Sequence, residues 1–202
     1  MKFFIIAAAA ALLPAILWSG EPASAGVAAI MDERLAPKPV KTEYFDGLFN
    51  LVKSSKAIVE TPSGLSEAQK QTIRKTFADY WEIVPELNFL AAEKSADSSP
   101  EGYSLKVAKD SIKISAGGFD GVRHALKTLR QLSEYGRDGD GYYIQLCEIS
   151  DRPALAFRAV HLCIYPETTP AELEKRVRLA AYYKFNYVVL EPWGTFPFES
   201  HP

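Results

Sequence analysis

The sequence predicts an α+β domain, a sheet with two helices on one face, followed by a single β-α-β unit. Apolar residues alternate in short segments, which is typical of strands with one buried face. Two longer segments carry a single apolar stripe each, which indicates helices that pack on a sheet. After Pro153 the strands become almost wholly apolar, as in a parallel sheet covered on both sides. We place the domain at 57–152 and the β-α-β unit at 153–202.

Residues 1–25 are typical of a signal peptide. Lys2 precedes an apolar stretch from Phe3 to Trp18, and Ala23-Ser24-Ala25 fits the small-residue cleavage pattern. An apolar stretch of about 16 residues is shorter than the ~20 that span a bilayer. We therefore expect export to the periplasm or the extracellular space, with cleavage after Ala25 and no stable membrane anchor.

Composition excludes several classes of function. The net charge of the 202 residues is -2, so no basic excess indicates nucleic acid as a partner. Export permits a disulfide, but Cys147 and Cys163 each lie in an apolar predicted strand, which favours two buried free thiols. The three histidines and two cysteines show no ligand spacing, so the sequence predicts no metal site and no cofactor. The oligomeric state stays open.

The first half of the predicted domain follows a lead-in segment, 26–56, that contains Pro37-Lys38-Pro39. Ala57 to Val59 is a candidate strand. Ser66 and Gln69 have the spacing of a capping box at a helix start. The apolar stripe of this helix consists of Ile73, Phe77, Tyr80, Trp81 and Val84.

The second half begins with a candidate strand from Leu87 to Ala92. Apolar residues alternate with other residues in Tyr103 to Val107 and in Ile112 to Ile114. A polar turn separates the two segments, which predicts a hairpin. Asp120 can cap a second helix, and Tyr142 to Leu146 alternates as a last strand. The stripe of the second helix consists of Val122, Ala125, Leu126, Leu129 and Leu132.

The β-α-β unit has a strong helix signal between two apolar strands. Phe157 to Ile164 and Asn186 to Leu190 are the strands. Thr169 and Pro170, with Glu172 in the first turn, are typical of a capped helix start. Two strands joined in this way are expected to be parallel, with a right-handed crossover.

The ordered motifs resemble glycoside hydrolase family 20, the β-N-acetylhexosaminidases. The stretch "EGYSLKVAKDSIKISAGGFDGVRHALKTLRQL" is similar to the accessory domain that precedes the catalytic barrel in that family. "ISDRPALAFRAVHLCI" and "LAAYYKFNYVVLE" resemble the first strand, first helix and second strand of the barrel. The resemblance implies that 153–202 begins an incomplete (β/α)8 barrel. It covers most of 57–191.

The resemblance implies an exo-glycosidase that removes terminal N-acetylhexosamines from a glycan substrate with retention of configuration. The acetamido oxygen of the sugar is the nucleophile in such substrate-assisted catalysis. The family's Asp-Glu pair on a later strand matches nothing in this chain, so we expect catalytic residues beyond Pro202 and no activity from this chain alone. A noncatalytic carbohydrate-binding or scaffold protein that retains the accessory domain is the alternative.

Three residues are candidates for substrate binding. Arg158 matches the first-strand Arg of the family, which implies hydrogen bonds to sugar hydroxyls; a structural pair with a carboxylate is the alternative. Glu191 and Trp193 follow the second strand, where barrel active sites are built, although ordinary loop packing explains them as well. Cys163 and Glu191-Pro192-Trp193 depart from the family pattern, so the sugar and linkage stay open. We interpret His161 as a structural residue that faces the helix layer.

Overall fold

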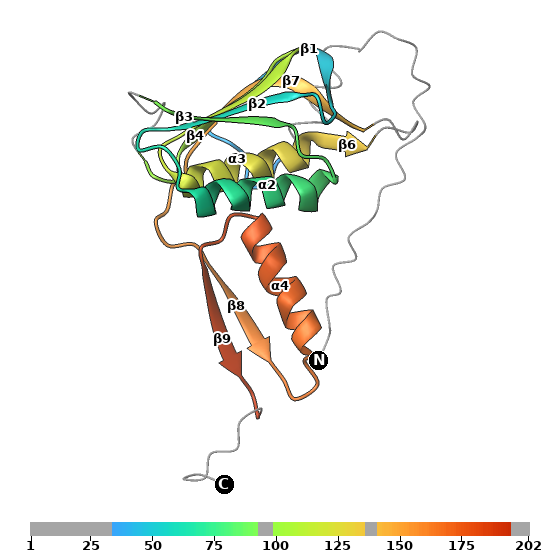
Figure 1. The fold of residues 1–202 in the computed structure, drawn as a ribbon. Coiled ribbons are helices and arrows are strands. Elements are labelled where there is room, and N and C mark those ends of the chain that lie inside the picture. Colours follow the sequence, from blue (N-terminus) through green and yellow to red (C-terminus); the bar gives the residue numbers. More distant parts are fainter. Residues whose placement is uncertain (1–33, 93–98, 136–140, 195–202) are drawn as a thin grey trace.

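The computed structural model describes residues 34–92, 99–135 and 141–194 (Figure 1). The predicted signal peptide, 1–25, lies outside the described residues and stays a prediction. Among the described helices, none has the length and apolar character needed to cross a membrane. The described chain forms a sheet domain with two helices and, below it in Figure 1, a smaller β-α-β unit.

One mixed sheet organises the larger part of the described chain. Its strands lie in the order β1-β7-β4-β5-β2-β3, and β6 pairs with β7. β2 runs parallel to β3 and β5, whereas the other pairs are antiparallel. The strands are β1 (Lys41–Leu51), β2 (Lys56–Thr61), β3 (Glu86–Ala91), β4 (Tyr103–Val107), β5 (Ser111–Ala116), β6 (Ser133–Tyr135) and β7 (Tyr142–Asp151).

Both helices of this domain lie on the same side of the sheet, as the sequence predicts (Figure 1). α2 (Glu67–Trp81) starts at the predicted capping box, in which Ser66 and Gln69 bond each other's backbone N–H groups. It buries Ile73, Phe77 and Trp81 at the predicted spacing. The α+β class is therefore confirmed.

The start of α3 (Phe119–Leu132) differs from the prediction. Gly118, not Asp120, is the residue that precedes the helix, and no side chain caps it. Asp120 lies within the first turn and pairs with Arg123 at 3.1 Å. A carboxylate in the first turn still interacts favourably with the positive end of the helix dipole. The predicted apolar stripe is confirmed, because all five of its residues are buried.

The sheet also begins earlier than the sequence indicates. Residues 41–51, within the predicted lead-in segment 26–56, form β1 and pair with β7 along most of its length. The alternation in this strand is interrupted by a register shift between Tyr44 and Leu48, where Gly47 adopts a φ of 114°. Such a bulge disrupts the period-two pattern by which strands are recognised.

The β-α-β unit comprises β8 (Ala159–Ile164), α4 (Pro170–Tyr182) and β9 (Tyr187–Pro192). β8 and β9 are parallel, as predicted, and Thr169 caps α4 by accepting a hydrogen bond from the Glu172 N–H at 3.2 Å. The expected burial of both strand faces is not met among the described residues, because Leu190 is 50 % exposed. A barrel beginning at this unit therefore stays a prediction.

A substitution at Gly121 tests how closely α3 packs against its neighbours in the sheet domain. A Cβ at this position would meet the Gly102 carbonyl oxygen closer than real Cβ atoms come and would lie 3.1 Å from the Ala116 Cβ. Gly→Ala in a helix ordinarily stabilises by about 0.5–1 kcal/mol. We expect Gly121→Ala to have the opposite effect and to lower the free energy of unfolding by about 1–3 kcal/mol.

Chemical denaturation of both proteins measures this difference. Gln71→Ala on the exposed side of α2 is the matched control, with an expected change within about 0.5 kcal/mol. A Gly121→Ala protein as stable as the wild type would contradict the close packing of α3 against Gly102.

Candidate functional site

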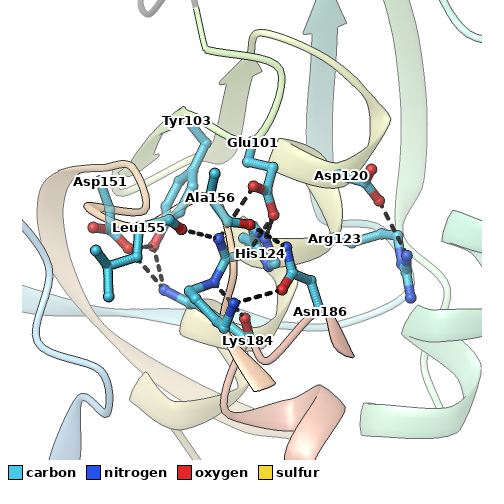
Figure 2. Close-up of polar contacts among 11 residues, drawn as sticks. Glu101, Tyr103, Asp120, Arg123, His124, Asp151, Leu155, Ala156, Lys184 and Asn186 are labelled. Carbon is cyan, nitrogen blue, oxygen red and sulfur yellow. Dashed lines mark hydrogen bonds and ion pairs between the residues drawn. The ribbon is translucent and has the colours of Figure 1, made fainter. Parts of the chain in front are cut away.

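A cluster of buried polar groups joins the sheet domain to the β-α-β unit. Arg158, immediately before β8, forms a two-pronged ion pair with Glu101, which lies just before β4 (Figure 2). Its Nη1 is 3.2 Å from Oε2 of Glu101, and its Nη2 contacts Oε1. The guanidinium also donates to the backbone oxygens of Leu155 at 2.6 Å and Lys184 at 3.0 Å. Arg158 thus has partners for most of its donors within the described chain.

The charge on Glu101 is stabilised by this arrangement. Its hydrogen bond with Arg158 is the main cause that lowers the pKa of the carboxyl group, and a hydrogen bond from His124 adds to it. His124 Nε2 lies 3.1 Å from Oε1 of the same carboxylate. The carboxylate therefore connects α3 with the chain that enters β8.

His124 is held in its neutral form. Burial is the main cause that lowers its pKa from 6.5 to about 4 and outweighs the opposing effect of Glu101. Its Nδ1 is buried without a hydrogen-bond partner. A neutral ring with the proton on Nε2 fits both observations, because Nε2–H then donates to Glu101 and Nδ1 carries only a lone pair.

A second buried node lies beside the first. Lys184 follows α4 with a positive φ of 66° and has a side chain only 5 % exposed. Its Nζ donates to Asp151 Oδ2 at 2.9 Å and to the Tyr103 hydroxyl at 3.1 Å (Figure 2). The Tyr103 hydroxyl also lies 2.6 Å from Thr128 Oγ1. Burial lowers the pKa of Lys184 and raises that of Tyr103.

These contacts leave a cavity between α3 and α4. It has a volume of about 580 Å³. Its polar lining includes Glu101, His124 and Lys127, and its apolar lining includes Val177 and Val188. Burial lowers the pKa of Lys127 to about 8. Tyr187 of β9 and Ala180 of α4 line the same cavity.

The other predicted site residues lie at the opposite end of the β-α-β unit. Glu191 is the fifth residue of the six in β9, and Trp193, which follows the strand, is 54 % exposed. Trp193 N–H donates to the Ile164 oxygen at 2.8 Å, which fixes the backbone there. Strand geometry puts roughly 15 Å between this end and Arg158. The structure thus groups Glu191 with Trp193 and separates both from Arg158.

His161 does not face the helix layer, contrary to the interpretation from the sequence. It is exposed, and it lies on the same face of the strand pair as Glu191. Its Nε2 lies 2.9 Å from Glu191 Oε2. Cys163, directly across from Glu191 in the register, is a partly buried free thiol, whereas Cys147 is a fully buried one. The His-x-Cys spacing on a strand was the signal for this shared face.

Neutral His124 predicts a specific pH dependence of stability. The unfolded histidine gains a proton near its ordinary pKa of 6.5, whereas the folded one resists protonation down to about 4. The unfolded state therefore binds more protons in this range, and stability falls as pH falls. We expect His124 to account for about 2 kcal/mol of lost stability between about pH 7 and about pH 5.

Denaturation curves of the wild type and His124→Gln at both pH values measure this contribution, because the Gln variant lacks it. His161→Gln, at an exposed histidine of β8, is the matched control. Equal pH dependence in the wild type and His124→Gln would show that His124 is not held neutral.

Known proteins resemble this chain in sequence and in fold. The family model described as glycosyl hydrolase family 20, domain 2 matches residues 32–152. A search of curated proteins found no match. Among solved structures, the chain is similar to the GH20 exo-β-N-acetylglucosaminidase of Vibrio harveyi in complex with N-acetylglucosamine, with 24% identity and a TM-score of 0.62. The match covers 79% of this chain and 25% of that one.

Two further solved structures show the same fold. The N-acetyl-β-hexosaminidase of Streptomyces plicatus has 20% identity and a TM-score of 0.63, over 79% of this chain and 34% of that one. The β-N-acetylhexosaminidase of Bacteroides fragilis has 22% identity and a TM-score of 0.61, over 78% and 33%. The chain thus spans a quarter to a third of the length of these relatives. Because the family model matches more than half of the chain, the resemblance seen in the sequence is confirmed: the chain belongs to glycosyl hydrolase family 20, and residues 32–152 are its domain 2.

Proposed function

We propose that the chain is the N-terminal part of an exported retaining exo-glycosidase that removes terminal N-acetylhexosamines from glycans by substrate-assisted catalysis. Family membership supports the hydrolase class, and the solved relatives are named as N-acetylglucosaminidases and N-acetylhexosaminidases. In this proposal β8, α4 and β9 begin a (β/α)8 barrel, with domain 2 packed beside its first strands.

The observation that carries the proposal is the pairing of an acid and an indole at the carboxyl end of β9. Active sites of such barrels are built at that end of the strands. Glu191 can accept hydrogen bonds from sugar hydroxyls, and the exposed Trp193 ring can stack on a sugar face. The proposal assigns these residues to binding and assigns the acid/base pair to the barrel beyond Pro202.

The exposed apolar surface of the β-α-β unit supports a larger barrel. The exposed large hydrophobic residues of this unit include the strand residues Tyr187, Val188, Val189 and Leu190. Soluble proteins rarely expose contiguous apolar surface of this kind unless another part of the protein or a partner covers it. Further barrel strands beside β8 and β9 would bury these side chains.

Hydrolysis of a chromogenic N-acetylglucosaminide by the full-length protein tests the proposal directly. Turnover with retention of configuration is expected, and a polypeptide ending at Pro202 should show none. Binding of N-acetylglucosamine without turnover would favour the noncatalytic carbohydrate-binding alternative. Turnover by the short polypeptide that is lost on changing one of its own residues would overturn the assignment of catalysis to the later strands.

We expect Glu191 and Trp193 to contribute to substrate binding rather than to folding stability. Glu191→Gln removes a charge-assisted hydrogen bond, so kcat/KM should fall by about ten- to a hundredfold. Trp193→Ala removes the stacking surface and should lower kcat/KM by a similar factor of about ten or more. Thermal midpoints should change little, since both side chains are exposed.

Steady-state kinetics and thermal melts of each variant measure the two effects separately. Phe45→Ala, at an exposed aromatic residue of β1 in domain 2, is the matched control and should keep wild-type kinetics. Normal kinetics in Trp193→Ala and Glu191→Gln would remove both residues from the binding site.

Arg158 requires a different comparison, because the structure gives it a partner within the protein. If the guanidinium serves only the Glu101 pair, Arg158→Ala and Glu101→Gln should both lower the thermal midpoint and keep normal kinetics. If it also holds sugar hydroxyls, Arg158→Ala alone should lower kcat/KM by about tenfold or more. The geometry favours the first pattern, because Glu101 and two backbone oxygens hold the guanidinium at the amino end of β8, away from Glu191 and Trp193; if the second pattern holds, Arg158→Lys should rescue poorly because an ammonium lacks the planar fork.

Kinetics and melts of the three variants distinguish these outcomes. Glu101→Gln is the matched control because it breaks the same ion pair without altering Arg158. Equal kcat/KM values for Arg158→Ala and Glu101→Gln would limit Arg158 to the junction between the domains.

A further inference from the structure

Three side chains of different ligand types converge on one face of the β8–β9 pair. His161 and Cys163 are two residues apart on β8, so both project from the same face of the strand. The parallel register places Glu191 of β9 directly beside Cys163. The carboxylate Oε2 of Glu191 is 2.9 Å from His161 Nε2 and 3.6 Å from Cys163 Sγ. All three ligand atoms lie within 4.8 Å of one another.

We propose that His161, Cys163 and Glu191 form a binding site for a zinc ion. Four-coordinate Zn²⁺ takes imidazole nitrogen, thiolate sulfur and carboxylate oxygen at about 2.0–2.3 Å. Tetrahedral bonds of that length separate neighbouring ligand atoms by roughly 3.3–3.7 Å. The Cys163–Glu191 separation of 3.6 Å falls within this range, and all three atoms lie within 4.8 Å of one another. Side-chain rotations that open the 2.9 Å His161–Glu191 contact would bring the three atoms into position.

The donor set selects the class of metal. A thiolate and an imidazole disfavour Mg²⁺ and Ca²⁺, which prefer oxygen ligands, and favour zinc among the available divalent ions. On binding, the Cys163 thiol loses its proton to solvent and its sulfur bonds the metal, with no change in oxidation state. Three protein ligands leave a fourth position that water can fill, as in zinc sites with an open coordination position.

The cluster contributes little as a purely structural feature. The side chains of His161 and Glu191 are 53% and 42% exposed, and an exposed pair of this kind contributes on the order of 0–1 kcal/mol. His124 differs, since its buried ring already contacts Glu101. The three groups share one face of β8 and β9, and Cys163 and Glu191 are each the fifth of the six residues of their strands.

This inference goes beyond the proposed function and does not rest on it. Zinc binding is measured without any sugar, so the failure of one hypothesis leaves the other intact. The sequence predicts no metal site because the third ligand, Glu191, is 28 residues from Cys163 along the chain. The cluster depends on the register between two parallel strands, which spacing along the chain does not contain.

Titration of the metal-depleted, reduced full-length protein tests the site. Isothermal calorimetry with Zn²⁺ should give one ion per chain for the wild type. His161→Ala, Cys163→Ser and Glu191→Gln should each weaken binding by about tenfold or more. Glu172→Gln on α4 is the matched carboxylate control and should bind as the wild type does.

Cobalt supplies an independent spectroscopic readout. Co²⁺ in the wild type should give a thiolate-to-metal charge-transfer band, and Cys163→Ser should lose it while retaining Cys147. In addition, bound Zn²⁺ should protect Cys163 of the wild type from alkylation, as followed by mass spectrometry, so this measurement needs no variant to fold. Absence of stoichiometric Zn²⁺ binding, a charge-transfer band that survives Cys163→Ser, or unchanged alkylation of Cys163 in Zn²⁺ would each overturn the proposal.

Discussion

The arrangement of the molecule depends on one buried ammonium group. The Nζ of Lys184, at the turn between α4 and β9, contacts Asp151 at the end of β7 and Tyr103 at the start of β4. Through the Tyr103 hydroxyl the same node reaches Thr128 on α3. A buried charge pair of this type often adds little net stability, because desolvation offsets the attraction. Its effect is on geometry: a misplaced β-α-β unit would leave a buried charge without a partner.

This constraint fixes which end of the strands meets domain 2. Arg158 and Lys184 lie at the amino ends of β8 and β9, and both contact residues of the sheet domain. The strands then run away from domain 2, as Figure 1 shows. Their carboxyl ends, with Glu191 and Trp193, are therefore clear of domain 2. An ion-pair network at one end of the strands thus keeps the other end accessible to a ligand.

Much of the fold could be predicted from residue patterns, because the signals are local. The capping box at Ser66, the stripe of α3 and the Thr169-Pro170 start of α4 each correspond to an element of the structure. β1 was missed because its bulge at Gly47 interrupts the alternation. The family motifs identified the resemblance, which the family model confirms.

The site was less predictable, because its contacts connect distant parts of the chain. Nothing near Glu101 in the sequence indicates Arg158 as its partner, and the position of His161 beside Glu191 depends on strand register. The sequence pattern puts His161 and Arg158 on one continuous strand, where alternation directs them to opposite faces. β8 begins after Arg158, whose side chain turns back toward domain 2. Alternation along the chain therefore does not relate the two side chains.

The pairing of β1 with β7 has a consequence for how the chain folds during synthesis. β1 is made early, yet its partner strand follows about a hundred residues later, as the contact between Gln145 and the Phe45 oxygen illustrates. Contacts between such distant segments require closure of a long loop and form slowly. While the ribosome is still making α3, β1 has no neighbour in the sheet, so its exposed edge needs protection from other chains. Completion of β7 joins β1 to β4, and only then does the surface exist on which the following β-α-β unit can dock.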